Sequence, residues 1–233
     1  HDLIVRAWTE PGPFQYRGKH YQFNYVNPWP VPTQKPHPPI WIPSQGSFET
    51  IKWAAQKRYT YCQTLSPIGE VAKFFRAYRE EAEKSGYQAT IDQCAWSTTI
   101  YVAETDAIAK REAKDALESL TNVFLRQSVE QLVPPGYSSI DSMLKIRQVK
   151  TQVLTKPRSI DDMIAAGVVI IGSAATVREK LEEYQALAGF NTALVKTQFG
   201  TLSAELTKKN MEAFAAEVMP HLQAQERTKA AAE

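Results

Sequence analysis

The sequence has only two cysteines in 233 residues, Cys62 and Cys94. They show neither CxxC spacing nor the density of a disulfide scaffold, which fits a reducing compartment. No signal-peptide pattern is visible at the N-terminus, so we expect a cytoplasmic protein. No apolar run approaches the roughly 18 residues that a membrane span needs, so we expect no membrane partner.

An excess of charge is also lacking. The 27 Lys and Arg residues against 25 Asp and Glu residues leave a formal net charge of +2, without blocks of one sign, so nucleic acid is not an expected partner. The four histidines do not occur in HxH, HxxxH or HExxH spacing, and no carboxylate cluster accompanies them. We therefore expect no metal site. His20 and His37 lie in an aromatic segment where they could face a ligand, but an isolated loop histidine is more often a surface residue.

The N-terminal residues already have helical apolar spacing, with Leu3 and Ile4 followed by Ala7 and Trp8, and no N-cap residue precedes them. We therefore expect the chain to begin inside a helix of a longer protein. Residues 11–39 are rich in proline and aromatics and are expected to form a packed insertion. Within it, residues 18–25 alternate apolar and polar side chains like a hairpin strand.

After the insertion the pattern changes to repeated strand–loop–helix units. Strands are expected at 39–43, 59–65, 95–103 and 190–199, and helices at 47–56, 68–85, 106–132, 173–189 and 203–222. Residues 133–166 are expected to be an irregular insertion, and 224–233 a flexible tail. Periodicity does not assign the short apolar run Val168–Ile171.

Such units predict an α/β fold with a parallel sheet covered by helices. Four units are half of a (β/α)8 barrel, although a doubly wound open sheet has the same local pattern. We expect residues 1–223 to belong to one domain.

The best candidate site is the turn Ser44-Gln45-Gly46-Ser47 with Thr50, between an expected strand and an expected helix. Backbone N–H groups and hydroxyls at a helix N-terminus suit a phosphate, and glycine allows close approach. Taken alone, the segment is better explained by Ser47 acting as an ordinary N-cap. Gly172-Ser173-Ala174-Ala175-Thr176 offers the same chemistry, and there the capping explanation suffices.

Other residues are weaker candidates. Lys196 lies within the last expected strand and Gln198 near its end, where a barrel places active-site residues, but a strand lysine could equally point toward the helices. No base accompanies the cysteines, so they are expected to be small buried side chains. Three tryptophans are more typical of a core than of a stacking platform: Trp41, Trp53 and Trp96.

Three motifs occur in an order that strongly resembles the bacterial-luciferase-like flavin-dependent monooxygenases: Pro13 to Tyr21 (PFQYRGKHY), Gln34 to Pro43 (QKPHPPIWIP) and Gly46 to Thr50 (GSFET). Four further segments also resemble that family: Gly172 to Val177, Lys180-Leu181, Gly189 to Asn191 and Glu217 to Pro220. The resemblance implies a (β/α)8 TIM barrel of which this chain supplies the C-terminal half, about strands five to eight. It also implies that Val168–Ile171 is an extended lead-in to a helix rather than a core strand.

The resemblance further implies an enzyme that uses reduced FMN and O2 to oxygenate a small organic substrate, with the flavin delivered by an NAD(P)H-dependent reductase. It places the FMN phosphate at Gln45, Gly46, Ser47 and Thr50, so that binding is favoured over capping alone. No catalytic residue is identified, because that family holds the flavin ring with the first four strands. A homo-oligomer is expected. The alternatives are a relative that uses F420 and a non-catalytic half barrel that assembles with a partner.

Overall fold

The computed structural model describes residues 1–126, 140, 143–144 and 157–230 of the chain. The chain divides into two compact units, His1–Trp41 and Ile42–Glu233. Among the described residues, none of the helices is both long and apolar enough to cross a membrane.

The smaller unit is a helix followed by an antiparallel hairpin, with the elements α1 (Asp2–Thr9), β1 (Phe14–Arg17) and β2 (Gln22–Val26). The Arg6 guanidinium lies 4.2 Å from the centre of the Phe14 ring, and Nη1 donates to the carbonyl of Gln15 at 3.2 Å. These two contacts join α1 to β1. The expected helix and hairpin strand are confirmed, although that strand begins only at Gln22.

The larger unit is built on a sheet of five strands: β3 (Trp41–Ser44), β4 (Thr60–Thr64), β5 (Cys94–Val102), β6 (Val169–Gly172) and β7 (Thr192–Lys196). The order is β3-β4-β5-β6, and β7 also pairs with β5. β4, β6 and β7 are all parallel to β5. Because β7 pairs with residues 95–99, which overlap the residues that pair with β4 and with β6, it occupies the other edge of β5. The predicted α/β class with a parallel sheet is confirmed.

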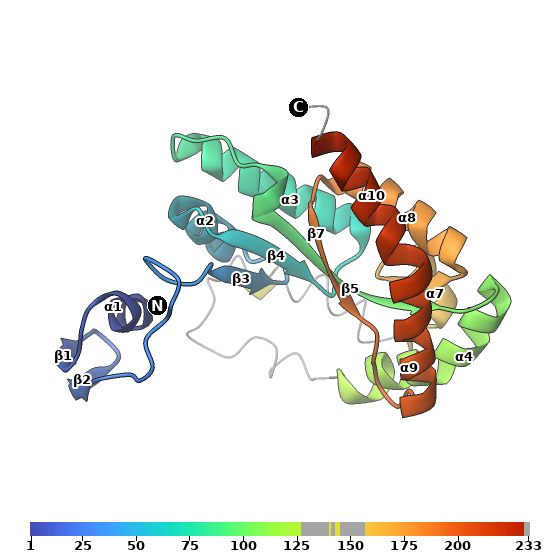
Figure 1. The fold of residues 1–233 in the computed structure, drawn as a ribbon, viewed down its shortest axis with the longest axis horizontal. Helices are drawn as coiled ribbons and strands as arrows, with labels where there is room; N and C mark the ends of the chain where they lie inside the picture. The colour runs from blue at the N-terminus through green and yellow to red at the C-terminus, as the bar shows by residue number, and fades with distance from the viewer. Residues whose placement is uncertain (127–139, 141–142, 145–156, 231–233) are drawn as a thin grey trace. The chain divides into compact units, whose positions relative to one another are not determined.

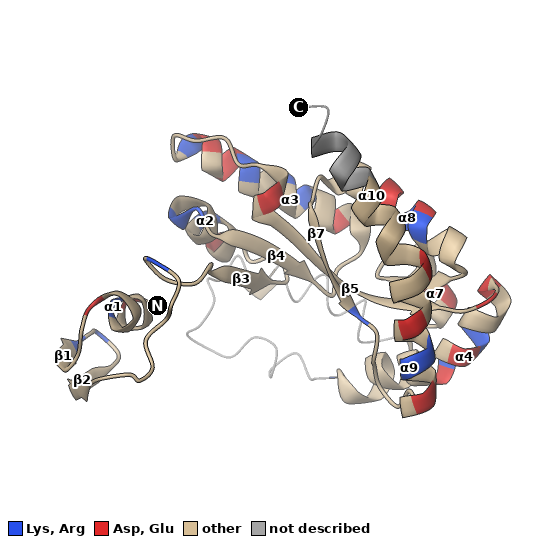
Figure 2. Ribbon diagram, in the orientation of Figure 1, with Lys and Arg blue, Asp and Glu red and all other residues tan. Residues whose placement is uncertain are grey.

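Helices connect the strands (Figure 1). Those described in the larger unit are α2 (Phe48–Lys57), α3 (Ile68–Lys84), the 3-10 turn η1 (Ile91–Gln93), α4 (Asp106–Ser119), the π-helical turn η2 (Leu120–Phe124), α7 (Ile160–Ala165), α8 (Ala174–Ala188), α9 (Ala204–Ala213), the π-helical turn η3 (Phe214–Val218) and α10 (Met219–Ala230). Figure 2 shows that the charged residues of this unit lie mainly on the helices, whereas the strands are almost without charge.

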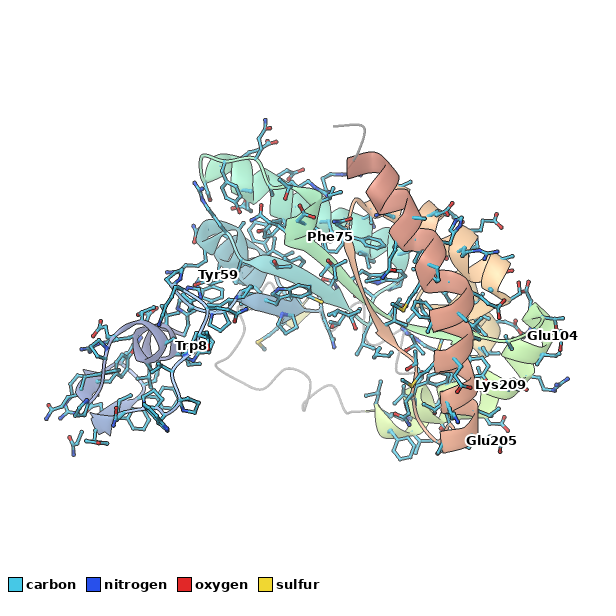
Figure 3. The ribbon with its side chains drawn as sticks, viewed as in Figure 1. Trp8, Tyr59, Phe75, Glu104, Glu205 and Lys209 are labelled. Atoms are coloured by element: carbon cyan, nitrogen blue, oxygen red, sulfur yellow. The ribbon has the colours of Figure 1, made fainter. Side chains whose placement is uncertain are left out.

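One core cluster lies between the sheet and the helices α2, α3 and α8. Trp96 is fully buried there, with its ring centre 5.7 Å from that of Tyr184 and 5.6 Å from that of Phe190. Phe75 of α3, labelled in Figure 3, belongs to the same cluster, and its ring centre lies 6.5 Å from that of Phe190. The expectation that Trp96 is a core residue is therefore confirmed.

The two faces of the sheet differ in what they contact. On β5, Cys94, Trp96 and Ile100 belong to this first core cluster, so the residues that alternate with them point to the second face. A second core cluster covers that face near β6 and the end of β5, where Tyr101, Val169 and α4 meet. The first half of β5 lies between β4 and β7. On the second face of the sheet, no described helix of the second cluster covers this part of β5.

Asn210 of α9 completes the edge of β5 where β7 stops pairing. Its Oδ1 accepts from the Val102 N–H at 2.8 Å, and its Nδ2 donates to the carbonyls of Ile100 and Thr197 at 2.9 Å each. The side chain is fully buried. One amide thus replaces the strand partner that the end of β5 lacks on this edge.

The resemblance implies that Val168–Ile171 is an extended lead-in to a helix rather than a core strand, and this expectation is wrong. These residues overlap β6, which is buried at all four positions and pairs with Thr99 to Val102 of β5. The physical reason is that β5 has nine residues and extends beyond β4, so its second half takes a further parallel partner.

Parts of several expected segments lie outside the described residues. The helix expected at 106–132 begins as α4 and η2, and residues 127–132 are not described. In the insertion expected at 133–166, α7 is the described helix. α10 extends to Ala230, into the segment for which a tail is expected.

Candidate functional site

The loop between β3 and α2 holds the four residues that the sequence predicts for cofactor binding. Ser44 ends β3, and its carbonyl accepts from the Thr64 hydroxyl at 3.3 Å, which joins the ends of β3 and β4. The Ser44 hydroxyl accepts from the Gly46 N–H at 3.1 Å. Gln45 follows Ser44 on the exposed side of this turn. The turn that leads into α2 is therefore held by hydrogen bonds at its start.

Two features of the position of Gly46, its backbone conformation and its contact with α3, exclude residues other than glycine. Its φ is +100°, in the region that favours glycine. A Cβ at this position would also clash with the ring of Phe74 on α3. The close approach of the loop to α3 therefore depends on glycine, and this fixes where α2 begins.

Ser47 is the N-cap of α2, as the simpler interpretation of the sequence predicts. Its Oγ accepts from the Thr50 N–H at 3.4 Å and donates to Oε2 of Glu49 at 2.9 Å. Within the described part of the chain, the Ser47 N–H and the Thr50 hydroxyl have no hydrogen-bond partner. These two groups, with the N-terminal end of the helix, are the donors that the loop offers to an anion.

The second Gly-Ser-x-x-Thr segment, Gly172 to Thr176, begins α8 with the same type of serine N-cap. Ser173 is the N-cap and accepts from the Thr176 N–H at 3.3 Å. Here an anion is built into the protein. The Asp106 carboxylate, from the first residue of α4, accepts from the Ser173 N–H at 2.6 Å and from the Thr176 hydroxyl at 3.1 Å.

These bonds stabilise the charged carboxylate and hold the pKa of Asp106 below its usual value, with the backbone N–H of Ser173 as the largest cause. The segment at α8 is therefore occupied by the protein's own carboxylate. The equivalent donors at α2, the Ser47 N–H and the Thr50 hydroxyl, are the ones that lack a described acceptor. The structure thus separates two segments that the sequence does not distinguish. Asp106 has no role in the sequence interpretation, since it lies 67 residues from Ser173.

The other candidates take up varied positions. Cys62 and Cys94 are buried, as expected, and desolvation raises the pKa of both thiols, that of Cys94 to about 11. His37 is half-buried and its Nδ1 lies 2.8 Å from the Pro38 carbonyl, whereas His20 is exposed. Trp41 is 38% exposed and belongs to neither core cluster, so the expectation that it is a core residue is wrong. The described residues contain no group of three potential metal ligands.

Lys196 and Gln198 lie at and beyond the end of β7. Gln198 is exposed and lines an open groove of about 620 Å³ with Leu202, Met211 and other residues of α9 and its approach. This groove does not include the loop before α2. Lys196 is half-buried, and desolvation lowers its pKa.

Comparison with known proteins gives a consistent result. Residues 1–190 match a protein family that is described as "Luciferase-like monooxygenase". The protein y4wF of Sinorhizobium fredii (strain NBRC 101917 / NGR234) is 26% identical over 204 residues, which are 86% of this chain and 53% of that protein.

Solved structures share the fold at low identity. The oxygenating constituent of 3,6-diketocamphane monooxygenase from Pseudomonas putida, in complex with FMN, has a TM-score of 0.66 at 18% identity, over 94% of this chain and 60% of that one. The coenzyme F420 dependent tetrahydromethanopterin reductase from Methanopyrus kandleri has a TM-score of 0.63 at 17% identity, over 95% and 61%. This chain thus spans little more than half the length of the proteins it resembles.

Proposed function

Because this chain belongs to the luciferase-like monooxygenase family, we propose that it is part of a flavin-dependent oxidoreductase and that the loop before α2 binds the phosphate of FMN. Gln45, Gly46, Ser47 and Thr50 form this site. The chain supplies the C-terminal half of a barrel, about strands five to eight. With the rest of the barrel it uses reduced FMN and O2 to oxygenate a small organic substrate in the cytoplasm.

One observation carries this proposal. The Gly-Ser-x-x-Thr segment at α8 binds the Asp106 carboxylate through a backbone N–H and a threonine hydroxyl. The same donors at α2 meet no described acceptor, and the N-terminal end of a helix favours an anion. An anion from outside the chain therefore has the same set of donors available at α2.

Glu49 competes with a phosphate for the Ser47 hydroxyl. Its carboxylate accepts from the Ser47 hydroxyl at 2.9 Å, so a phosphate that uses this hydroxyl has to displace Glu49. Ser47 still caps α2 in that state, because its Oγ accepts from Thr50 while its hydrogen turns to the ligand. Capping and binding are therefore compatible roles.

The chemistry of the reaction belongs to the flavin when it is bound, and the residues of this chain bind and orient it. Reduced flavin would come from an NAD(P)H-dependent reductase. F420 is the alternative cofactor, supported by the likeness to an F420-dependent enzyme. A non-catalytic half barrel that assembles with a partner is the alternative outside the enzymes.

Comparison of FMN with riboflavin tests the phosphate site, since the two differ only by the phosphate. We expect the chain to bind FMN more tightly than riboflavin, and Thr50→Val with Ser47→Ala to reduce FMN affinity about tenfold or more, with little effect on riboflavin. Quenching of flavin fluorescence measures both affinities. Thr50→Val alone leaves the helix cap intact and separates binding from capping.

Ser173→Ala with Thr176→Val is the matched control at α8, and it should leave the FMN to riboflavin ratio unchanged. An equal loss of FMN and riboflavin affinity in the α2 variants would reject the phosphate assignment. Tighter binding of F420 than of FMN would select the alternative cofactor.

A further inference from the structure

Among the five strands that the structure describes in the larger unit, Lys196 is the only Lys, Arg, Asp or Glu. It is the last residue of β7, at the carboxyl end of a parallel strand. In α/β sheets, ligands bind beyond the carboxyl ends of the strands. The single charge of the sheet therefore lies at the edge where a ligand is expected.

The pairing of the strands shows which way this lysine points. Ala193 and Val195 pack against the first core cluster, so Leu194 and Lys196 point to the second face of the sheet. Lys196 pairs with Thr99 of β5, and Thr99 alternates with Ile100, which belongs to the first cluster. The sequence left open whether Lys196 faces the helices, and the register places it on the opposite side.

Other polar groups lie on the same face. Thr64 pairs with Ser97, and Ser97 pairs with Leu194. Earlier along the strands, Cys62 pairs with Ala95. Toward their carboxyl ends, β4, β5 and β7 therefore present hydroxyl groups and an ammonium group on this face.

The ammonium group of Lys196 has no hydrogen-bond or ion-pair partner among residues 1–126 and 157–230. The side chain is half-buried, and desolvation lowers its pKa. A partly desolvated charge costs free energy unless an opposite charge compensates it. A bound anion would supply this compensation.

The phosphate site before α2 is too distant to be that anion. The order β3-β4-β5 with β7 on the far edge of β5 places three strand spacings between β3 and β7, which is about 14 Å. A lysine side chain does not extend that far. Lys196 therefore meets a different group.

We propose that Lys196 binds the anionic group of an organic substrate, a carboxylate or a sulfonate, at the carboxyl end of β7. That the ligand is a substrate rests on the proposed function. The binding of an anion by Lys196 depends only on the second face of the sheet. The hydroxyls of Ser97 and Thr99 lie on the same face as further donors. The half-exposed Leu194 offers apolar contact to the rest of the molecule.

Hexanesulfonate and hexanol are suitable probes, because they share an alkyl chain and differ in charge. Isothermal titration calorimetry of the 233-residue chain measures both affinities. Lys196→Met keeps most of the length of the side chain and removes its charge. We expect it to weaken hexanesulfonate binding about tenfold or more and to change hexanol binding less than about twofold. Lys196→Arg should retain most of the affinity.

Lys57→Met is the matched control, since Lys57 is an exposed lysine at the C-terminal end of α2. It should leave both affinities unchanged. Failure of the unmodified chain to bind hexanesulfonate, unchanged affinity in Lys196→Met, or an equal loss for hexanol would overturn the proposal.

FMN titration separates this inference from the proposed function. Lys196→Met should leave FMN affinity unchanged. If it weakens FMN and not hexanesulfonate, the charge serves the flavin and the substrate assignment is wrong. If the chain binds hexanesulfonate through Lys196 but does not bind FMN, the proposed function fails and the anion site stands.

Discussion

At the scale of single residues, Asp106 and Glu49 show two ways in which a carboxylate meets a helix N-terminus. Asp106 reaches α8 from another helix and accepts from the Ser173 N–H, whereas Glu49 lies within α2 and accepts from the hydroxyl of its N-cap. The first arrangement uses the donors of the Gly-Ser-x-x-Thr segment. The second leaves the equivalent backbone N–H and the threonine hydroxyl without a described acceptor.

Asp106→Asn should lower the thermal stability of the chain in a pH-dependent way. The pKa of Asp106 is lower in the folded state than the usual unfolded value of about 3.9. Its stabilising effect is therefore fully present above about pH 4, and it is lost as the pH falls through the folded pKa. We expect the difference in Tm between the unmodified chain and the variant to be largest near neutral pH and to shrink in acid.

Melting curves between about pH 2 and pH 7 measure this effect. Asp115→Asn is the control on the same helix, because Asp115 is an exposed residue of α4, and it should give a difference in Tm that does not vary in this way. A difference in Tm for Asp106→Asn that stays constant across this pH range would show that the charge of Asp106 does not stabilise α8.

At the scale of elements, Asn210 shows how a helix replaces part of a strand. Its amide pairs with Val102, Ile100 and Thr197 at the edge of β5 beyond the end of β7. Asn210→Ala would leave one buried N–H and two carbonyl groups without this partner. We expect a loss of at least about 3 kcal/mol in the free energy of unfolding.

Urea denaturation of the two proteins measures this loss. Lys208→Ala, at an exposed position of the same helix, should change the free energy by less than about 0.5 kcal/mol. A similar small effect of Asn210→Ala would mean that water replaces the amide at no cost.

The elements also differ in how well the sequence predicts them. α3 was predictable because its apolar residues recur at helical spacing, and β5 because its β-branched and aromatic residues form a run longer than a loop would allow. β6 was not, because four apolar residues have no periodicity of their own and become a strand only through pairing with the extended end of β5.

The position of the loop between β3 and α2 was predictable from the sequence, and its tertiary contacts were not. Gly46, Ser47 and Thr50 follow a strand and open a helix in the sequence itself. The contact of Gly46 with Phe74 depends on how α3 packs against the loop, and the bond between Asp106 and Ser173 joins residues far apart in the chain. Such tertiary contacts leave no local pattern.

At the scale of the whole molecule, the chain spans 53% of y4wF and about 60% of the solved structures it resembles. We propose that the second face of the sheet is completed by contact with another half of a barrel or with a second copy. Leu194 on β7, whose side chain points to this face, is 42% exposed. Burial of such side chains favours association.

Sedimentation velocity of the purified chain tests this expectation. The sedimentation coefficient should rise with concentration over the micromolar range, and Leu194→Asn should weaken this dependence because it removes apolar contact area. Leu187→Asn is the control, since Leu187 is an exposed leucine on α8. A monomer at all concentrations would contradict self-association through this face.

A crystal structure of the chain with FMN would show directly whether the loop before α2 binds the phosphate. We expect the phosphate at the N-terminus of α2, with its oxygens within hydrogen-bond distance, about 3 Å, of the Ser47 N–H and the Thr50 hydroxyl, and with the Ser47 hydroxyl turned away from Glu49. Asp106 should keep its bonds to Ser173 and Thr176 in the same crystal. A phosphate bound elsewhere, with the loop before α2 unchanged, would show that this loop is not the phosphate site.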